Sequence, residues 1–329
     1  MIIRLSSIGD ILLTTPFIRQ VRKRFPQAQL EFVVKKQYAD LLAFNPHIDV
    51  LYQFDNSILT LKRQIHNNFY EYIFDLHNNM RSIFIRYGLN CKQLFSINKD
   101  KFRRFILVYF RINLYSEIKS IPQRYQETGR EAVIVDDQKG LDFYWDKQTE
   151  QSSLKILSEK AVDLNKPILC IAPGAGFFTK RWPLEYFDRL IRHIINRHDV
   201  NIIIIGSPAE AALFNKLQIL HQVYNFAGSV NLIQTGYIIS KSILLLSNDS
   251  GMMHMATAVG TDVVAIFGSS VKELGFYPYR GQSVVIENEK IDCRPCSHIG
   301  RKSCPQKHFK CMVDIKPARV YESIKELLQ

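Results

Sequence analysis

Short apolar runs alternate with amphipathic stretches along most of the chain. The runs have the length and composition of buried strands, and they lie at Met1–Leu5, Leu30–Val34, Val50–Phe54, Tyr72–Leu76, Ile168–Ala172, Val200–Ile205, Ile243–Leu246, Val263–Phe267 and Ser283–Ile286. Helical spacing predicts helices at Ile11–Phe25, Pro183–Arg197, Pro208–Leu220, Val230–Ser240 and Pro317–Leu328. Strands that alternate with helices form parallel sheets covered on both faces. The pattern therefore predicts the α/β class, with two Rossmann-like domains facing a cleft.

The boundary between these domains is expected in a polar, helical stretch, Asp142–Lys166, after which a fresh strand begins at Pro167. A chain of 329 residues has room for two domains of ordinary size. We therefore expect a first domain at 1–150 and a second at 151–329. The final helix, 317–328, could pack back on the first domain.

The turn Asn248–His254 is the most informative segment of the chain. An apolar run enters it, and a helical stretch, Met255–Val259, leaves it. In such a strand–loop–helix unit the helix N-terminus presents free N–H groups to an anion, most often a phosphate. Asp249 or Ser250 could instead only cap the helix, although capping does not explain Gly251 and His254 on the same turn.

Two polar segments follow strands of the first half, where the strand ends of an α/β sheet line a crevice. Ser6–Asp10 opens the first long helix, so Asp10 could cap that helix or act as a general base. The segment Asp75–Arg81 follows another strand. Its close set Asp75, His77 and Arg81 indicates a binding site more strongly than ordinary loop polarity does.

A small-residue loop follows the first strand of the second half, at Ala172–Pro183. Gly174, Ala175 and Gly176 would let backbone N–H groups approach a phosphate, and Lys180 could neutralise it. The loop lacks the Gly-Lys-Ser/Thr ending of a P-loop. Together with the turn at Asp249, it predicts a site for a nucleotide diphosphate rather than for a single phosphate.

The formal net charge of +12 favours an anionic partner, which could be nucleic acid, acidic lipid or a phosphorylated sugar. The chain has no basic low-complexity tail, which argues against nucleic acid. Its apolar runs are far shorter than the ~20 residues of a membrane span, and a strand begins at Met1 where a signal peptide would stand. We therefore expect a cytoplasmic protein with reduced or metal-bound cysteines.

In these motifs the chain resembles glycosyltransferase family 9, the bacterial lipopolysaccharide heptosyltransferases. The resemblance runs in order over nearly the full length, at Arg4–Asp10, Asp75–His77, Asn79, Arg81-Ser82, Ala172–Ala175, Thr179–Pro183, Asn248–Gly251, His254 and Phe267-Gly268. The family usually has proline where Met252 and Ser269 stand. Both positions are beside the expected nucleotide site, so they bear on donor preference.

The resemblance implies a GT-B fold and an inverting transfer of heptose from ADP-heptose to the lipopolysaccharide inner core, either to lipid A–Kdo or to the growing core. Asp10 would be the general base, and Lys180 would hold the leaving diphosphate. The implied donor site comprises Gly174, Ala175, Gly176, Thr179, Lys180, Glu210, Asp249, Ser250, Gly251 and His254. The implied acceptor site comprises Ser7, Gly9, His77, Asn79 and Arg81.

No cofactor is expected for catalysis, because the chain contains no Asp-x-Asp motif that would hold a metal on the diphosphate. Cys293, Cys296, Cys304 and Cys311 could bind a structural zinc ion or could be unliganded thiols. The basic aromatic segment Lys99–Arg111 could lie on an anionic membrane leaflet at the inner membrane, or pack its aromatic rings inward.

Three other functions remain open at this point. The protein could be a family member that uses a different nucleotide sugar, a GT-B nucleotide-sugar epimerase, or a non-catalytic anion-binding protein. An epimerase needs no acceptor-side base at Asp10, and the presence of both Asp10 and Lys180 argues against a protein that only binds anions.

Overall fold

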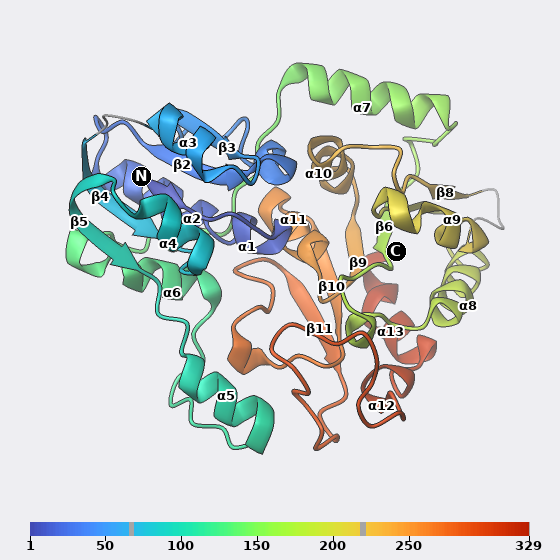
Figure 1. Cartoon of the computed structure of the whole chain (residues 1–329). Coiled ribbons are helices and arrows are strands. Elements are labelled where there is room, and N and C mark those ends of the chain that lie inside the picture. The colour runs from blue at the N-terminus through green and yellow to red at the C-terminus, as the bar shows by residue number, and fades with distance from the viewer. Residues whose placement is uncertain (66–68, 218–221, 329) are drawn as a thin grey trace. The chain divides into compact units, whose positions relative to one another are not determined.

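The computed structural model describes residues 1–65, 69–217 and 222–328. The described chain divides into two compact units, each built on its own parallel sheet (Figure 1). The first unit is Met1–Lys99 with Lys119–Trp145, and the second is Asp100–Ile118 with Asp146–Gln329. This division differs from the expected ranges 1–150 and 151–329 mainly at residues 100–118, which belong to the second unit.

The first unit has a five-stranded sheet in the order β3-β2-β1-β4-β5, with every described pair of neighbours parallel. Its strands are β1 Ile2–Ile3, β2 Glu31–Lys35, β3 Val50–Phe54, β4 Phe69–Asp75 and β5 Asn90–Ser96. Its helices are α1 Ile8–Leu12, α2 Thr15–Arg24, α3 Ile58–Ile65, α4 Met80–Arg86 and α6 Ile121–Thr128. The strand order reverses between β1 and β4, so the chain segments that follow these strands meet at one switch point.

The second unit has a six-stranded parallel sheet in the order β11-β10-β9-β6-β7-β8. Its strands are β6 Ile168–Ala172, β7 Asn201–Ile204, β8 Val223–Asn225, β9 Leu244–Asn248, β10 Asp262–Phe267 and β11 Ser283–Glu287. Its helices are α5 Lys101–Phe110, α7 Lys147–Glu159, α8 Leu184–Ile195, α9 Ala211–Phe214, α10 Leu232–Ser240, α11 Gly251–Val259, α12 Lys310–Val313 and α13 Pro317–Ile324. This is the doubly wound order of a Rossmann sheet, with its switch point between β6 and β9.

Two expected helices are interrupted in the structure. Ile11–Phe25 is split into α1 and α2, because Pro16 has no N–H to donate to Leu12 and the hydroxyl of Thr15 bonds the carbonyl of Leu12 instead. The expected helix Pro208–Leu220 is a short 3₁₀ turn, α9 and another 3₁₀ turn ending at Leu217. Its last three residues, 218–220, lie outside the described residues.

The final helix is part of the second unit. α13 packs against α8, and the buried side chains of Val320, Ile324 and Leu328 belong to the core that β6, β7 and α8 share. The apolar face of this helix is therefore used within the second unit. None of the described helices has the length and apolarity needed to cross a membrane.

Candidate functional site

Asp10 lies on the first turn of α1, directly after β1, and its carboxylate is held from two sides. The backbone N–H and the hydroxyl of Ser7 donate to Oδ2, at 3.1 and 2.8 Å. Nη2 of Arg4 is 2.6 Å from Oδ1. Asp10 thus caps α1, which is one of the two roles expected for it. Its side chain is still 19% exposed.

The charge of Asp10 is set by these contacts. Burial alone would raise the pKa of Asp10, but the Arg4 guanidinium and the hydrogen bonds from Ser7 outweigh burial and hold the pKa below its ordinary value. Arg4 is itself fixed, because Nη1 donates to the carbonyl of Leu76 at 2.6 Å and Nε donates to the carbonyl of Ser6 at 3.0 Å. The first unit therefore presents an ionised carboxylate in a defined position at the switch point of its sheet.

The segment after β4 places His77 in the same region. Burial, followed by the charges of Arg4 and Lys99, lowers the pKa of His77 to about 3, so the imidazole is neutral at ordinary pH. Among the described residues none hydrogen-bonds Nδ1 of this ring. A neutral imidazole offers one N–H and one acceptor nitrogen, which suits a hydroxyl-rich ligand.

The other expected acceptor residues have different surroundings. The side-chain oxygen of Asn79 caps α4 by accepting from the N–H of Ser82 at 3.1 Å. Asp75 is fully buried and accepts from the backbone of His77 and the hydroxyl of Ser82, so it shapes the turn. Arg81 is exposed on α4, and Gly9 is a buried residue of α1.

In the second unit the loops after β6 and β9 meet at the switch point. Nζ of Lys180 lies 2.7 Å from Oδ2 of Asp249, with both side chains largely buried. The hydroxyl of Ser270 also donates to that oxygen. Asn248 joins the two loops, since it accepts from the N–H of Trp182 at 3.1 Å and donates to the carbonyl of Pro173 at 2.7 Å.

The start of α11 is open to a ligand in the way the anion-site expectation requires. Ser250 is the N-cap residue of this nine-residue helix, yet its side chain makes no cap hydrogen bond in the described structure. Its hydroxyl lies 3.1 Å from that of Ser247, and Asp249 is committed to Lys180 and Ser270. The expectation that Asp249 or Ser250 merely caps the helix is therefore wrong, and the first N–H groups of α11 keep their donor capacity.

The carboxyl group of Glu210 closely approaches Gly174, so a side chain at position 174 would displace that group. A Cβ atom there would lie 2.8 Å from Cδ of Glu210, whereas a Cβ atom at Gly176 would meet nothing within 4 Å. The carboxylate of Glu210 is fixed by the N–H and the hydroxyl of Ser207, at 3.0 and 2.7 Å. Glu210 therefore reaches the loop after β6, beside the half-buried backbone of Gly174.

Thr179 and its neighbours give the site its framework. Thr179 is 1% exposed, and its hydroxyl accepts from the N–H of Arg301 at 2.8 Å and from the hydroxyl of Ser269 at 3.0 Å. Ala175 is buried and its carbonyl accepts from Nε of Arg181 at 2.7 Å. His254 is 3% exposed on α11, and Gly251 is the first residue of that helix.

Sequence reasoning missed the roles of Arg4 and Ser270, and it noted Ser269 only as a departure from the family pattern beside the expected nucleotide site. Arg4 was seen only as part of a motif, although it is the partner of Asp10. Ser269 and Ser270 hydrogen-bond Thr179 and Asp249, and only its place after a strand end could have indicated Ser270. These bonds join segments far apart in the chain, which a linear pattern does not reveal.

The cysteine cluster does not form a metal site here. Within residues 1–65, 69–217 and 222–328, no three His, Cys, Asp or Glu side chains are placed to hold a metal ion. Sγ of Cys293 lies 3.9 Å from Nε2 of His308, and burial raises the pKa of Cys311 to about 12. The described side chains are thus not arranged as the structural zinc site that was one of the two alternatives for these cysteines.

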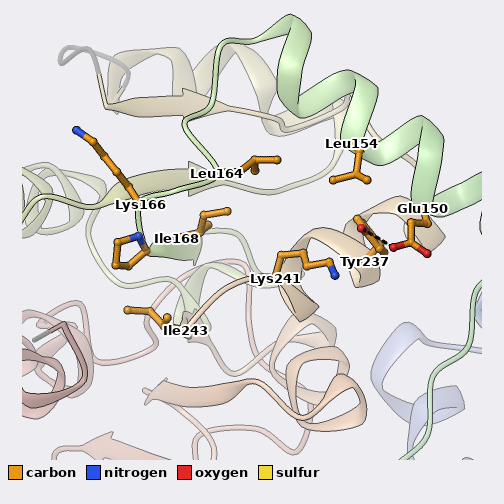
Figure 2. Close-up of a pocket in the computed structure, with 9 residues that line it drawn as sticks. Glu150, Leu154, Leu164, Lys166, Ile168, Tyr237, Lys241 and Ile243 are labelled. Carbon is orange, nitrogen blue, oxygen red and sulfur yellow. Dashed lines mark hydrogen bonds between the residues drawn. The ribbon is translucent and has the colours of Figure 1, made fainter.

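A pocket of about 360 Å³ in the second unit lies away from this site (Figure 2). It opens between α7 and α10, beside Ile168 and Ile243 where strands β6 and β9 begin. The hydroxyl of Tyr237 donates to Glu150 at 3.1 Å across its wall. Because ligands of open α/β sheets bind at the carboxyl ends of strands, we place the candidate donor site at Lys180 and α11.

Comparison with known proteins identifies the family of the chain. The model of glycosyltransferase family 9 (heptosyltransferase) matches residues 58–307. The chain belongs to glycosyltransferase family 9. Lipooligosaccharide heptosyltransferase 2 of Campylobacter jejuni is 26% identical over 98% of this chain and 96% of its own length.

Two solved family 9 structures share the fold. The glycosyltransferase family 9 protein of Veillonella parvula superimposes with a TM-score of 0.82 at 20% identity, covering 99% of this chain and 96% of that one. The E. coli ADP-heptose lipopolysaccharide heptosyltransferase II gives a TM-score of 0.74 at 19% identity, covering 99% and 97%. The expected α/β class and GT-B fold are thereby confirmed, and the chain is a glycosyltransferase of this family.

Proposed function

We propose that this protein transfers a heptose from ADP-heptose to the inner core of lipopolysaccharide, with inversion at the anomeric carbon. The observation that carries the proposal is the pairing of Lys180 with Asp249 beside the uncapped N-terminus of α11. Family membership supports a heptose donor, because relatives that span nearly the whole chain are named lipooligosaccharide and lipopolysaccharide heptosyltransferases.

In the proposed mechanism Asp10 is the general base. Its depressed pKa keeps it ionised, and each of its oxygens has lone pairs beyond those used by Arg4 and Ser7. It accepts the proton of the acceptor hydroxyl as that oxygen attacks the anomeric carbon of the heptose. His77, neutral and beside this carboxylate, hydrogen-bonds the acceptor sugar.

The donor side stabilises the leaving group. As the glycosidic bond to the diphosphate breaks, negative charge accumulates on ADP, and Lys180 and the first N–H groups of α11 bind that charge. Asp249 positions Lys180, and the Gly174 loop with Glu210 receives the nucleoside. No cofactor takes part in these steps.

The acceptor is an anionic glycolipid, so the enzyme works in the cytoplasm in peripheral contact with the inner membrane. The net charge of +12 suits that partner without any role for nucleic acid. A family member with another donor is the second candidate, since Ser269 stands where the family usually has proline and its hydroxyl bonds Thr179.

Purified protein with ADP-heptose, other nucleotide sugars and a delipidated inner-core acceptor tests the proposal. Transfer that requires both ADP-heptose and acceptor supports it. Transfer from a different nucleotide sugar identifies the second candidate, conversion of the donor without acceptor identifies an epimerase, and nucleotide binding with no product from any pair identifies a protein that only binds anions.

A further inference from the structure

Helix α5 has two apolar faces, and only one of them packs on the protein. Leu107 and Val108 are buried, at 5% and 6% exposure. The segment after the helix is fixed to the second unit, where Nδ2 of Asn113 donates to Oε1 of Glu273 at 3.2 Å. Leu107 and Val108 thus form the buried face of α5, and the helix belongs to the second unit.

The second apolar face is aromatic and exposed. Phe102, Phe105, Tyr109 and Phe110 are 70%, 48%, 65% and 60% exposed. The rings of Phe105 and Tyr109 lie 4.7 Å apart, so the aromatic side chains form a continuous surface. Because residues of an α-helix are about 100° apart around its axis, positions 102, 105 and 109 share one face, roughly opposite the buried pair. The ring of Phe110 lies 6.0 Å from that of Phe105 and extends this surface sideways. We call Phe102, Phe105, Tyr109 and Phe110 the α5 aromatic face.

Cations border this aromatic face. Lys101 and Arg103 are exposed on α5, and Arg111 is exposed at its end. The helix from Lys101 to Phe110 contains no Asp or Glu. Exposed apolar surface continues past the helix at Ile112 and Leu114, at 54% and 44%. Figure 1 labels α5 at the lower left of the cartoon.

This composition distinguishes the possible occupants. Aromatic rings and flanking Lys or Arg side chains are the residues that settle at the headgroup level of a bilayer, where the rings contact acyl chains and the cations contact phosphates. A second copy of this chain would bring a net charge of +12 toward the same cations, which opposes self-association at this surface. Charge complementarity therefore favours an anionic lipid surface.

We propose that the α5 aromatic face, with Lys101, Arg103 and Arg111, docks the protein on a membrane surface rich in anionic lipid. The rings of Phe102, Phe105, Tyr109 and Phe110 enter the interface, and the cations bind lipid phosphates. The inference rests on the proposed function in one respect, since it names the surface through which an enzyme with a glycolipid acceptor reaches its membrane.

Vesicle co-sedimentation of the full chain tests this surface. Wild-type protein should bind phosphatidylglycerol–phosphatidylethanolamine vesicles, bind phosphatidylcholine vesicles weakly, and dissociate at high salt. Phe102→Ser/Tyr109→Ser and Lys101→Glu/Arg103→Glu should each weaken anionic-vesicle binding about tenfold or more. Matched controls are Leu59→Ser/Leu213→Ser and Lys147→Glu/Arg319→Glu, which alter exposed residues outside α5 and should bind as wild type does.

A single tryptophan substitution on α5 reports membrane contact by fluorescence, and it can be used if a double variant folds poorly. In Tyr109→Trp, the new indole should shift to shorter emission wavelength on anionic vesicles and be quenched by lipids labelled in the acyl chain, whereas the indole of Leu59→Trp should not respond. Any of three results overturns the proposal. The indole of Tyr109→Trp does not respond to vesicles, the α5 variants bind vesicles as well as wild type does, or the control variants lose as much vesicle binding as the α5 variants. A change in oligomeric state with α5 substitution and no vesicle binding assigns the surface to a second copy instead.

Activity on a delipidated acceptor separates this proposal from the proposed function. The α5 variants should keep wild-type turnover on that soluble acceptor, because none of the altered residues belongs to the Asp10 or Lys180 sites. Vesicle binding without transfer from any donor would leave the docking surface in place and refute the heptosyltransferase proposal. Transfer without vesicle binding would support the heptosyltransferase proposal and refute the docking surface.

Discussion

The guanidinium of Arg4 holds the carboxylate of Asp10 at 2.6 Å, directly after the first strand of the chain. Arg4 also reaches the end of β4 through the carbonyl of Leu76. One side chain thus positions the candidate base, fixes its charge and joins the two strands at the switch point of the first sheet. A carboxylate paired with a cation is held in place and stays ionised, but it is a weaker base than an unpaired carboxylate.

Asp10→Asn should bind ADP as wild type does and lose roughly 10²–10⁴-fold in turnover, because the amide cannot accept the acceptor proton. Calorimetry with ADP and initial-rate assays measure the two effects. Ser7→Ala is the matched control, since it removes one hydrogen bond to the carboxylate and should cost far less. Near-normal turnover in Asp10→Asn would remove this residue from the chemistry.

Arg4→Gln should raise the pKa of Asp10, because the largest influence opposing burial is lost. The deprotonated form is the active one, so turnover falls as pH drops through this pKa, and the acid limb of the kcat/KM profile should move to higher pH in the variant. Arg4→Lys should shift it less. The lowered pKa of Asp10 also stabilises the folded protein at every pH above the pKa that Asp10 has in the unfolded chain. This stabilisation is lost as the pH falls through the pKa of Asp10 in the folded protein. An acid limb that does not move would assign it to another group.

Lys180→Ala should weaken ADP binding and slow turnover together, because its charge acts on both the bound diphosphate and the leaving group. A loss of about tenfold or more in ADP affinity is expected for a charge-assisted contact. Lys302→Ala removes an exposed cation of the same unit and should leave both quantities unchanged. Undiminished affinity in Lys180→Ala would place the diphosphate elsewhere.

Gly174→Ala should reduce nucleotide affinity, because the added methyl group would lie 2.8 Å from Cδ of Glu210 and displace its carboxylate. Gly176→Ala, in the same loop, meets nothing within 4 Å and should be nearly neutral. The affinity of Gly174→Ala should not fall further when Glu210→Ala is added, since the clash is then relieved. Equal losses at positions 174 and 176 would refute this role of Glu210.

EDTA should leave the initial rate nearly unchanged, because Lys180 and the N-terminus of α11 serve the leaving group in the proposed mechanism. The assay compares rates with EDTA, with EDTA followed by excess Mg²⁺, and without additions. A rate abolished by EDTA and restored by Mg²⁺, at constant thermal unfolding midpoint, would contradict the metal-independent mechanism.

The two loops that we expect to bind phosphate could be placed from sequence because buried strands with near-continuous apolar composition bracket them. The loops after β6 and β9 then meet at the switch point by the topology of a doubly wound sheet. β5 was not expected, because this edge strand, Asn90–Ser96, is largely exposed and mixes Lys92 and Gln93 with its apolar residues. An exposed edge carries no burial pattern that sequence reasoning could use.

Pairs far apart in sequence were the other limit. The link from Thr179 to Ser269 and Arg301 spans about a third of the chain. Even the nearby pair Arg4 and Asp10 could not be inferred without the cap geometry of α1. The alternative that the basic aromatic segment packs its aromatic rings inward is wrong, because α5 buries Leu107 and Val108 and leaves the rings exposed. Periodicity predicts that a helix has an apolar face, but it does not select which of two such faces meets the protein.

The placement of α13 has a consequence for the order in which the protein can fold during synthesis. The core around β6, β7 and α8 is completed by Met312, Ile315, Val320 and Ile324, and Nε1 of Trp182 donates to the carbonyl of Ile315 at 2.8 Å. Those residues leave the ribosome more than a hundred residues after Trp182. We therefore expect the first unit to fold while translation continues, whereas the loop that carries Lys180 acquires its final support only once α12 and α13 have been synthesised.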